Sequence, residues 1–159
     1  MKRIASVVGG MVLAAGSLFF TSPSAHAAAQ ASYGCAGVEI DSYALKYGTV
    51  TYGTIHLFYD SSSGKNCAVN VATSAGGYGT PTYKGVWLGR CPAGYKPGAS
   101  CTDVSDPYVQ DPSSSATKYS QYAGPVSVSA AGRCIEVGGS ITAPNGTNAH
   151  HTTYATHCG

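Results

Sequence analysis

The stretch QYAGPVSVSAAGRCIEVGGSI, residues 121–141, alternates apolar and polar residues on both sides of a small turn, which is typical of β-structure. Val126 and Val128 alternate with serines after Pro125. Because proline has no N–H to donate to a ladder, we expect this strand to lie at an edge or to begin at Pro125. The residues AAG, 130–132, predict a hairpin turn into a second strand with a Gly-Gly pair. We therefore interpret the stretch as a structural segment that holds the fold together. Its Gly-Gly pair would permit a β-bulge or the close approach of another backbone segment.

The chain beyond residue 27 repeats these short alternating runs and shows no helical periodicity. In VEIDSYAL the alternation places Val38 and Ile40 on one face, and the acidic residues Glu39 and Asp41 together on the other. Six or seven short strands with Gly/Ser turns predict an all-β domain, either a small β-sandwich or a barrel. The other strands are predicted in TIHLFYD (54–60), CAVNVAT (67–73), YKGVWLG (83–89) and the tail before Cys158. In the first of these, one face carries Ile55, Leu57 and Tyr59. In the second, one face carries Cys67, Val69 and Val71.

The first 27 residues have the three parts of a secretory signal peptide. Lys2 and Arg3 form a basic head, and an uncharged apolar run follows. Ala25 and Ala27 fit the small-residue pattern before a cleavage site. The apolar run is shorter than the about 20 residues that a membrane helix needs, so no membrane anchor is expected. We expect a signal peptide at 1–27, a flexible N-terminus at 28–34, and one secreted, extracellular β-rich domain at 35–159 with a loop excursion at 91–118.

The charge of the chain is low and balanced, which bears on its partners. Nine Lys and Arg residues stand against seven Asp and Glu residues, and two of the basic residues lie in the predicted leader. Nucleic-acid-binding proteins carry basic stripes or patches, which this chain lacks. We therefore expect neither a nucleic acid nor an anionic membrane as a partner.

An even number of cysteines behind a secretion signal predicts disulfides, and this chain has six. The loop PAGYKPGAS, residues 92–100, lies between two of them and makes that local pair the first expected. No two cysteines have the CxxC spacing of a zinc knuckle, so no metal site is expected. The favoured pairing is Cys91–Cys101, Cys35–Cys67 and Cys134–Cys158, and the alternative joins Cys35 to Cys158 and Cys67 to Cys134.

The chain is rich in tyrosine, with twelve residues, and has one tryptophan. Tyrosines are ordinary strand formers, and this structural reading is favoured over a binding one. Aromatic side chains with a polar tip can also stack on sugar rings or contact a partner. The candidate binding surface consists of Trp87, Tyr83, Tyr119 and Tyr122.

No catalytic or metal-binding motif occurs at its required spacing. The GxSxG elbow of serine hydrolases is absent. His150 and His151 are adjacent and so point to opposite faces of a strand, and His157 would lie about 20 Å from His151 in an extended tail. Glu39 and Asp41 are read as solvated residues on a polar face rather than as a catalytic pair. We therefore expect no enzymatic activity, no cofactor and no metal.

The segments VEIDSYAL, IHLFYDSSSGKNCAVNV, YAGPVSVSAAGRCIEVGGSI and the terminal HCG resemble the spore-associated protein A family of actinomycetes. The resemblance is strongest over 35–73 and 119–159. It implies a small, secreted, β-rich protein of the spore or cell surface with no assigned chemistry. Family members usually carry four cysteines, which correspond here to 35, 67, 134 and 158, and are usually shorter than this chain around 91–118.

These observations predict a secreted, non-catalytic structural or interaction protein of the spore or cell surface. Spore-coat or cell-wall polysaccharide is the expected partner. One alternative is a module that binds cell-wall glycan through exposed Tyr and Trp side chains. Another is a protease inhibitor that presents the 91–101 loop with Lys96, because a rigid disulfide-framed loop suits preorganised inhibition. A hydrolase with a site built from distant residues is the third alternative.

Overall fold

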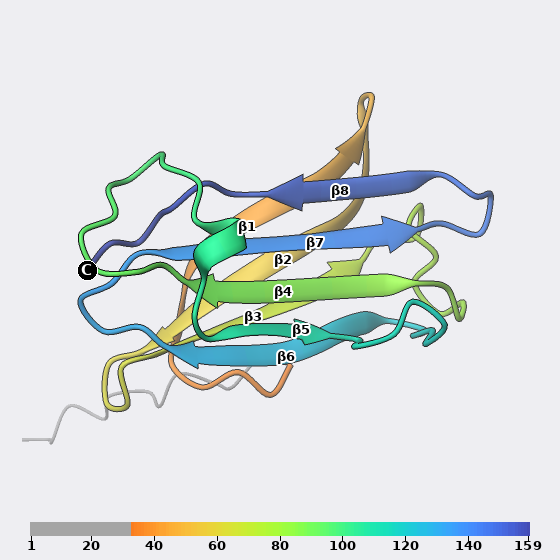
Figure 1. Ribbon diagram of the computed structural model, residues 1–159. Coiled ribbons are helices and arrows are strands. Elements are labelled where there is room, and N and C mark those ends of the chain that lie inside the picture. Colours follow the sequence, from red (N-terminus) through yellow and green to blue (C-terminus); the bar gives the residue numbers. More distant parts are fainter. Residues whose placement is uncertain (1–32) are drawn as a thin grey trace, which may run out of the picture.

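In a computed structural model of the protein, residues 33–159 are described, and they form eight antiparallel strands and one short 3-10 helix (Figure 1). The expected signal peptide, 1–27, and residues 28–32 of the expected flexible N-terminus lie outside the described residues. Residues 33–159 contain no helix with the length and apolar character needed to span a membrane. The strands are β1 (Val38–Tyr47), β2 (Val50–Asp60), β3 (Lys65–Ala72), β4 (Lys84–Arg90), β5 (Tyr108–Asp111), β6 (Tyr122–Ser129), β7 (Ile135–Thr142) and β8 (Asn148–Thr152), and the helix η1 spans Thr102–Val104.

All eight strands belong to one sheet, in the order β5-β4-β7-β8-β1-β2-β3-β6. The sheet curls so that its edge strands β5 and β6 lie side by side and nearly close a barrel (Figure 1). Asp111 of β5 links the two edges, because its Oδ2 accepts a hydrogen bond from the Gly124 N–H of β6 at 2.6 Å and its Oδ1 accepts one from the Tyr119 hydroxyl at 2.7 Å. The expected all-β class is confirmed, and the sheet is barrel-like.

The sheet has one more strand than the six or seven predicted. The extra strand is β5, which forms inside 91–118 and pairs with β4 from Val86 to Gly89. That segment is therefore not a loop excursion along its whole length. The prediction that the strand with Pro125 lies at an edge is confirmed, since this strand is β6.

The predicted hairpin at 130–132 is wrong. The strand before it, β6, pairs with β3, whereas the strand after it, β7, pairs with β4 and β8. Because both sides of β7 are occupied by other strands, β6 cannot fold back onto it. The turn instead crosses one end of the barrel, at the end where the C-terminus lies (Figure 1).

The prediction that Glu39 and Asp41 share a face of β1 is wrong, because a β-bulge interrupts the strand. The register with β2 shifts between Glu39 and Asp41, so these carboxylates lie opposite adjacent residues of β2, which face opposite sides of the sheet. Val38 is 56% exposed, whereas Ile40 packs against the core. The bulge thus separates Glu39 from Asp41, whereas Val38 lies opposite Tyr59, which lines the same pocket as Ile40.

The barrel interior contains the main apolar cluster, and one buried asparagine links three strands across it by hydrogen bonds. Asn70 of β3 is fully buried, and its Nδ2 donates to the carbonyl oxygens of Gly85 in β4 at 2.9 Å and Ser140 in β7 at 3.2 Å. A Cβ at Gly139 would lie 2.9 Å from that Nδ2, so the close approach expected at the Gly-Gly pair is present. The largest fully buried apolar side chains are Leu45, Ile55, Leu57, Leu88, Ile135 and Ile141.

A second, smaller cluster lies on the outer face of β2 and β3. The disulfide Cys35–Cys67 holds the N-terminal segment against this face, where Phe58 and Val69 are buried. The side chain of Tyr33 stacks on His56 and packs edge-on against Tyr122. β2 and β3 are therefore covered on both sides, on one by the barrel core and on the other by residues 33–37.

The end of the barrel opposite the C-terminus is closed by Lys84, the first residue of β4. Its side chain is fully buried, and Nζ donates to Thr80 O at 3.1 Å, Thr82 Oγ1 at 2.8 Å and Tyr119 O at 2.8 Å. An ammonium group has three N–H donors, so every donor has a partner. Burial lowers the pKa of Lys84 below its usual value. We call this the closed end of the barrel.

Candidate functional site

The opposite end of the barrel, where the turn 130–132 and the C-terminal tail meet, contains a pocket of 240 Å³. We call it the open end. The pocket opens between the start of β1, the end of β2 and the start of β3, so it leads from the surface toward the barrel interior. Its walls combine apolar and polar groups: Ile40, Tyr59, Asn66, Ala130, Ala131 and His157, together with two glycines.

The open end exists because small residues occupy the positions that would fill it. The turn that crosses the barrel here is Ala130-Ala131-Gly132, which carries no side chain larger than a methyl group. The tail packs directly against this turn, since a Cβ at Gly159 would lie 2.7 Å from the Gly132 Cα. The disulfide Cys134–Cys158 ties the tail to the residue before β7 and so fixes the position of His157 in the pocket wall.

Asn66 is the most buried polar residue of the pocket. It is 3% exposed and lies on the same side of β3 as Ala68 and Asn70, which face the barrel interior. Within residues 33–159 its side chain makes no hydrogen bond. Buried carboxamides are normally hydrogen-bonded, so Asn66 presents a free donor and a free acceptor to whatever occupies the pocket.

A polar cluster lies beside the pocket, in the gap where β1 and β8 diverge. These strands pair only at Lys46 and His150. Beyond that point the Tyr43 hydroxyl donates to Asp41 Oδ2 at 2.8 Å, and His157 Nε2 lies 3.4 Å from this hydroxyl and 3.3 Å from Asp41 Oδ2. His157 thus belongs both to this cluster and to the wall of the pocket.

The electrostatics of this cluster favour a structural role over acid–base chemistry. Burial and the neighbouring Asp41 carboxylate raise the pKa of Tyr43 well above its usual value. Burial alone would raise the pKa of Asp41, but hydrogen bonds from Tyr43, Ser42 and His157 outweigh it and lower that pKa. Tyr43 therefore stays protonated and donating, and Asp41 stays ionised and accepting, across the neutral range.

The histidines of the tail are closer together than an extended chain allows. The ring of His151 stacks on Tyr43 with a centroid distance of 5.3 Å, and His157 lies against the hydroxyl of the same tyrosine. The tail bends back after β8, so the predicted separation of about 20 Å does not apply. Among residues 33–159, no three His, Cys, Asp or Glu side chains are grouped closely enough to hold a metal ion.

The four predicted aromatic residues do not form one surface. Trp87 and Tyr83 lie together on the outer face of β4, where Trp87 covers Gly138 and Tyr83 covers Gly85. Tyr119 donates to Asp111 between the edge strands. Tyr122 lies on the outer face of β3 and β6, against Tyr33, with ring centroids 5.4 Å apart.

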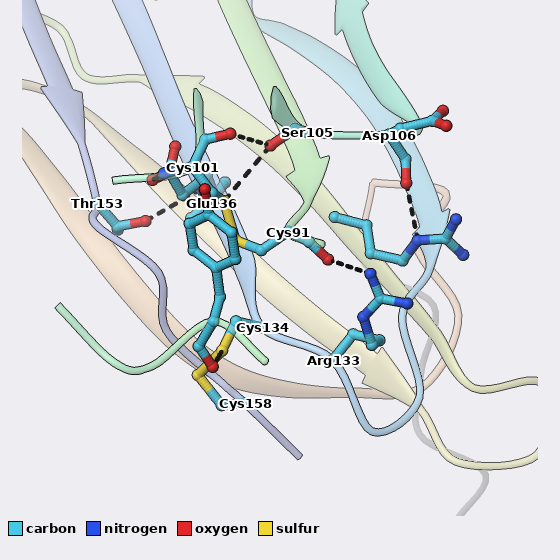
Figure 2. The surroundings of a disulfide bond; sticks show 12 residues. Cys91, Cys101, Ser105, Asp106, Arg133, Cys134, Glu136, Thr153 and Cys158 are labelled. Atoms are coloured by element: carbon cyan, nitrogen blue, oxygen red, sulfur yellow. Dashed lines mark hydrogen bonds between the residues drawn. A yellow bond between two sulfur atoms is a disulfide. The ribbon is translucent and has the colours of Figure 1, made fainter. Parts of the chain in front are cut away.

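The three disulfides join the pairs favoured from the sequence: Cys35–Cys67, Cys91–Cys101 and Cys134–Cys158. Figure 2 shows how the loop between Cys91 and Cys101 is held. Its two ends are fixed by buried polar contacts, since Cys101 N–H donates to the Glu136 carboxylate and Arg133 Nη2 donates to Cys91 O at 2.6 Å. Its middle pairs with the tail, because Gly98 N–H donates to Ala155 O at 2.9 Å.

Sequence reasoning missed the buried polar residues, of which Asn66, Lys84 and Glu136 are the main examples. Each belongs to a strand whose neighbouring residues alternate between the two faces of the sheet. The signal was available in β3, where one face reads Asn-Ala-Asn-Ala from Asn66 to Ala72. Such a face looks like a solvated surface, although in this protein it lines the barrel interior.

The chain is similar to a curated protein, Spore-associated protein A of Streptomyces coelicolor, with 36% identity over 107 residues. The match covers 67% of this chain and 54% of that protein, so the chain spans about half the length of the curated relative it matches. No protein-family model matches the chain. No solved structure matches it either.

Proposed function

Because the chain belongs to the spore-associated protein A family, we propose that it is a secreted, non-catalytic protein of the spore or cell surface. The name of the Streptomyces relative supports the spore association. The disulfides support the compartment, since such bonds form and persist mainly outside the cytoplasm. The leader-like sequence of residues 1–27 is consistent with the same route.

The placement of the three disulfides is the observation that carries this proposal. No cysteine of the described chain is free. One bond holds the N-terminal segment on β3, one holds the C-terminal tail at β7, and one closes the loop after β4. Each bond stabilises the folded state by about 3 kcal/mol if strain is small. The disulfides thus hold the N-terminal segment, the C-terminal tail and one loop, which are the parts of a domain where local unfolding usually begins.

The surface suits a hydrated, neutral matrix such as spore-coat or cell-wall polysaccharide. Charged residues make up 10% of the chain, well below the about 25% of an average protein. Within residues 33–159 the ion pairs are two histidine–carboxylate contacts, His56 with Glu39 and His157 with Asp41. A surface with so few charges has little electrostatic attraction for anionic polymers, and hydroxyl-rich polymers are the better match.

Fractionation of the producing culture tests the proposal. Spores, mycelium and medium are separated and probed with an antibody against the protein, with a cytoplasmic enzyme as the lysis control. We expect the protein in the spore-surface wash and the medium, and not with the cytoplasmic marker. Recovery only with the cytoplasmic marker would contradict the proposal.

Protease inhibition by the 91–101 loop remains a second proposal, favoured by the way the loop is held. Both ends and the middle of the loop are fixed, and Ala99 N–H donates to Lys96 O at 3.2 Å in an exposed turn. A preformed loop loses little entropy on binding. We expect Lys96→Ala to weaken inhibition of a trypsin-like protease, and the absence of inhibition of any secreted protease would end this proposal.

A further inference from the structure

We propose that the open-end pocket binds the acetamido group of an N-acetylated sugar, through the side-chain amide of Asn66. The pocket itself is independent of the proposed function. Only the source of the sugar, a polymer of the spore or cell surface, rests on that function.

Asn66 is the first reason to expect a polar ligand. Its side chain is buried in the pocket wall and makes no hydrogen bond within the described part of the chain. Asn70, on the same face of β3, is bonded differently, since its Nδ2 donates to two carbonyl oxygens while its Oδ1 is buried without a partner. The fully buried unpartnered side-chain atoms of residues 33–159 are Asn70 Oδ1 and Arg133 Nε, so the amide of Asn66 is reached through the pocket and can hydrogen-bond a ligand that enters it.

The size of the pocket leaves room for much more than one bridging water. The volume is 240 Å³, whereas one water in the liquid takes about 30 Å³. It is also smaller than the about 300–1,000 Å³ of sites for drug-sized ligands. The pocket therefore accommodates one terminal sugar unit, or the acyl group of such a unit, rather than the middle of a glycan chain.

The lining selects the chemical class of the ligand. No lysine or arginine lines the pocket, and the lining His157 is engaged with the Asp41 carboxylate, so the pocket offers phosphate and carboxylate ligands no free cationic side chain. A carboxamide donates and accepts at once, and the acetamido N–H and C=O are its direct complement. The acetamido methyl matches the small apolar surface of Ala130, Ala131 and Ile40. A plain hexose offers hydroxyls but no methyl for this surface.

Tyr59 and His157 provide the remaining contacts of a sugar site. Tyr59 is an aromatic residue of the wall, with an apolar ring and a polar tip. His157 is held in place by its contacts with Tyr43 and Asp41, so its ring is positioned before a ligand arrives. Preorganised side chains reduce the entropy lost on binding.

NMR titration of the oxidised, ¹⁵N-labelled protein tests the proposal, with N-acetylglucosamine, glucose and acetamide as probes. We expect saturable shifts with N-acetylglucosamine at the Asn66 side-chain NH2 and at the backbone amides of Ala131 and Gly132. Acetamide should shift the same signals at higher concentration, and glucose should not shift them.

Two variants and a matched control locate the site. Asn66→Ala removes the proposed partner, and Ala131→Leu fills the pocket from an exposed turn, where folding is not at risk. Each should weaken binding of N-acetylglucosamine at least tenfold. Asn148→Ala changes an exposed asparagine at the start of β8, opposite Thr142 at the end of β7 that is away from the pocket, and should leave binding unchanged.

Several results would overturn the proposal. These are equal affinity for glucose and N-acetylglucosamine, full binding by both pocket variants, no saturable shift with N-acetylglucosamine, or shifts confined to Trp87 and Tyr83 on the outer face of β4. A protein that is found on spores and yet shows one of these results refutes the pocket proposal and leaves the proposed function standing.

Discussion

The two ends of the barrel treat buried polar side chains in opposite ways. At the closed end, Lys84 is fully buried and all three of its N–H donors reach oxygen atoms. At the open end, Asn66 is almost as buried, and its amide has no partner within residues 33–159. The two groups also differ in what they face: the Lys84 donors point at oxygen atoms of the protein, whereas the Asn66 amide lines a pocket and can contact a ligand there.

The ends also differ in how they are held. The open end is fastened covalently, because Cys134–Cys158 ties the tail that forms one of its walls. The closed end is held by the hydrogen bonds that the Lys84 ammonium group donates to three oxygen atoms. We therefore expect mutations at the closed end to affect stability, and mutations inside the open-end pocket to affect binding while leaving stability nearly unchanged.

The largest expected effect comes from Lys84→Ala. The substitution leaves a cavity and removes the donor from Thr80 O and Tyr119 O, so we expect the free energy of unfolding to fall by about 3–5 kcal/mol. Urea unfolding followed by tryptophan fluorescence measures it. Lys118→Ala, an exposed lysine, is the control and should change stability by less than about 0.5 kcal/mol. Equal effects of the two variants would mean that Lys84 does not close the barrel.

Removal of the disulfide at the open end should have the next largest effect. The double variant Cys134→Ser, Cys158→Ser opens a loop with a sequence separation of 24, and we expect a loss of about 3 kcal/mol from loop closure. The comparison is the double variant Cys91→Ser, Cys101→Ser, and these two cysteines have a sequence separation of 10. We expect it to lower the free energy of unfolding by less. A larger loss of stability in the Cys91 and Cys101 variant than in the Cys134 and Cys158 variant would mean that the position of the tail does not depend on its disulfide.

Tyr119→Phe removes one hydrogen bond near the closed end and should have a smaller effect. The lost bond to the Asp111 carboxylate is expected to cost about 2 kcal/mol, because the acceptor is charged. The same bond, with burial, raises the pKa of Tyr119 to about 12. The unfolded chain therefore loses this proton first, and the stabilisation present below pH 10 is lost as the pH rises from about 10 to about 12. Stability measured across this range should fall less steeply in Tyr119→Phe than in the parent protein.

The smallest effect on stability is expected from Asn66→Ala, which removes an unpartnered amide. We expect a change within about 0.5 kcal/mol of zero. Asn70→Ala, the same substitution on the same face of β3, leaves two carbonyl oxygens without their donor and should cost about 2 kcal/mol. Similar losses in both variants would show that Asn66 is a structural residue like Asn70.

The contrast along β3 also shows what the sequence could and could not predict. Alternation correctly groups Cys67, Val69 and Val71 on one face. It does not reveal that this apolar face is the outer one, buried beneath the segment attached by Cys35, while the face of alanine and asparagine lines the barrel. Which face is inside depends on how the sheet closes, and that is a property of all eight strands.

The open end was hidden from sequence reasoning for a related reason. A turn of Ala-Ala-Gly between two alternating runs is an ordinary hairpin signal, and here it joins strands that pair with other partners. The bulge in β1 likewise puts Glu39 and Asp41 on opposite faces, and Asp41 contacts Tyr43 and His157 on its own face. The all-β class and the Cys91–Cys101 pair followed from local patterns, whereas the other two cysteine pairs were favoured with an alternative left open, and the pocket is formed by segments far apart in the chain.

The central claim is that covalent sulfur links hold this barrel in an extracellular setting at the spore surface. Peptide mapping of protein washed from intact spores, alkylated without reduction, tests it most directly. The account predicts three linked peptide pairs, Cys35 with Cys67, Cys91 with Cys101 and Cys134 with Cys158, and no alkylated cysteine. Alkylated cysteines in the washed protein, or other pairs, would contradict it.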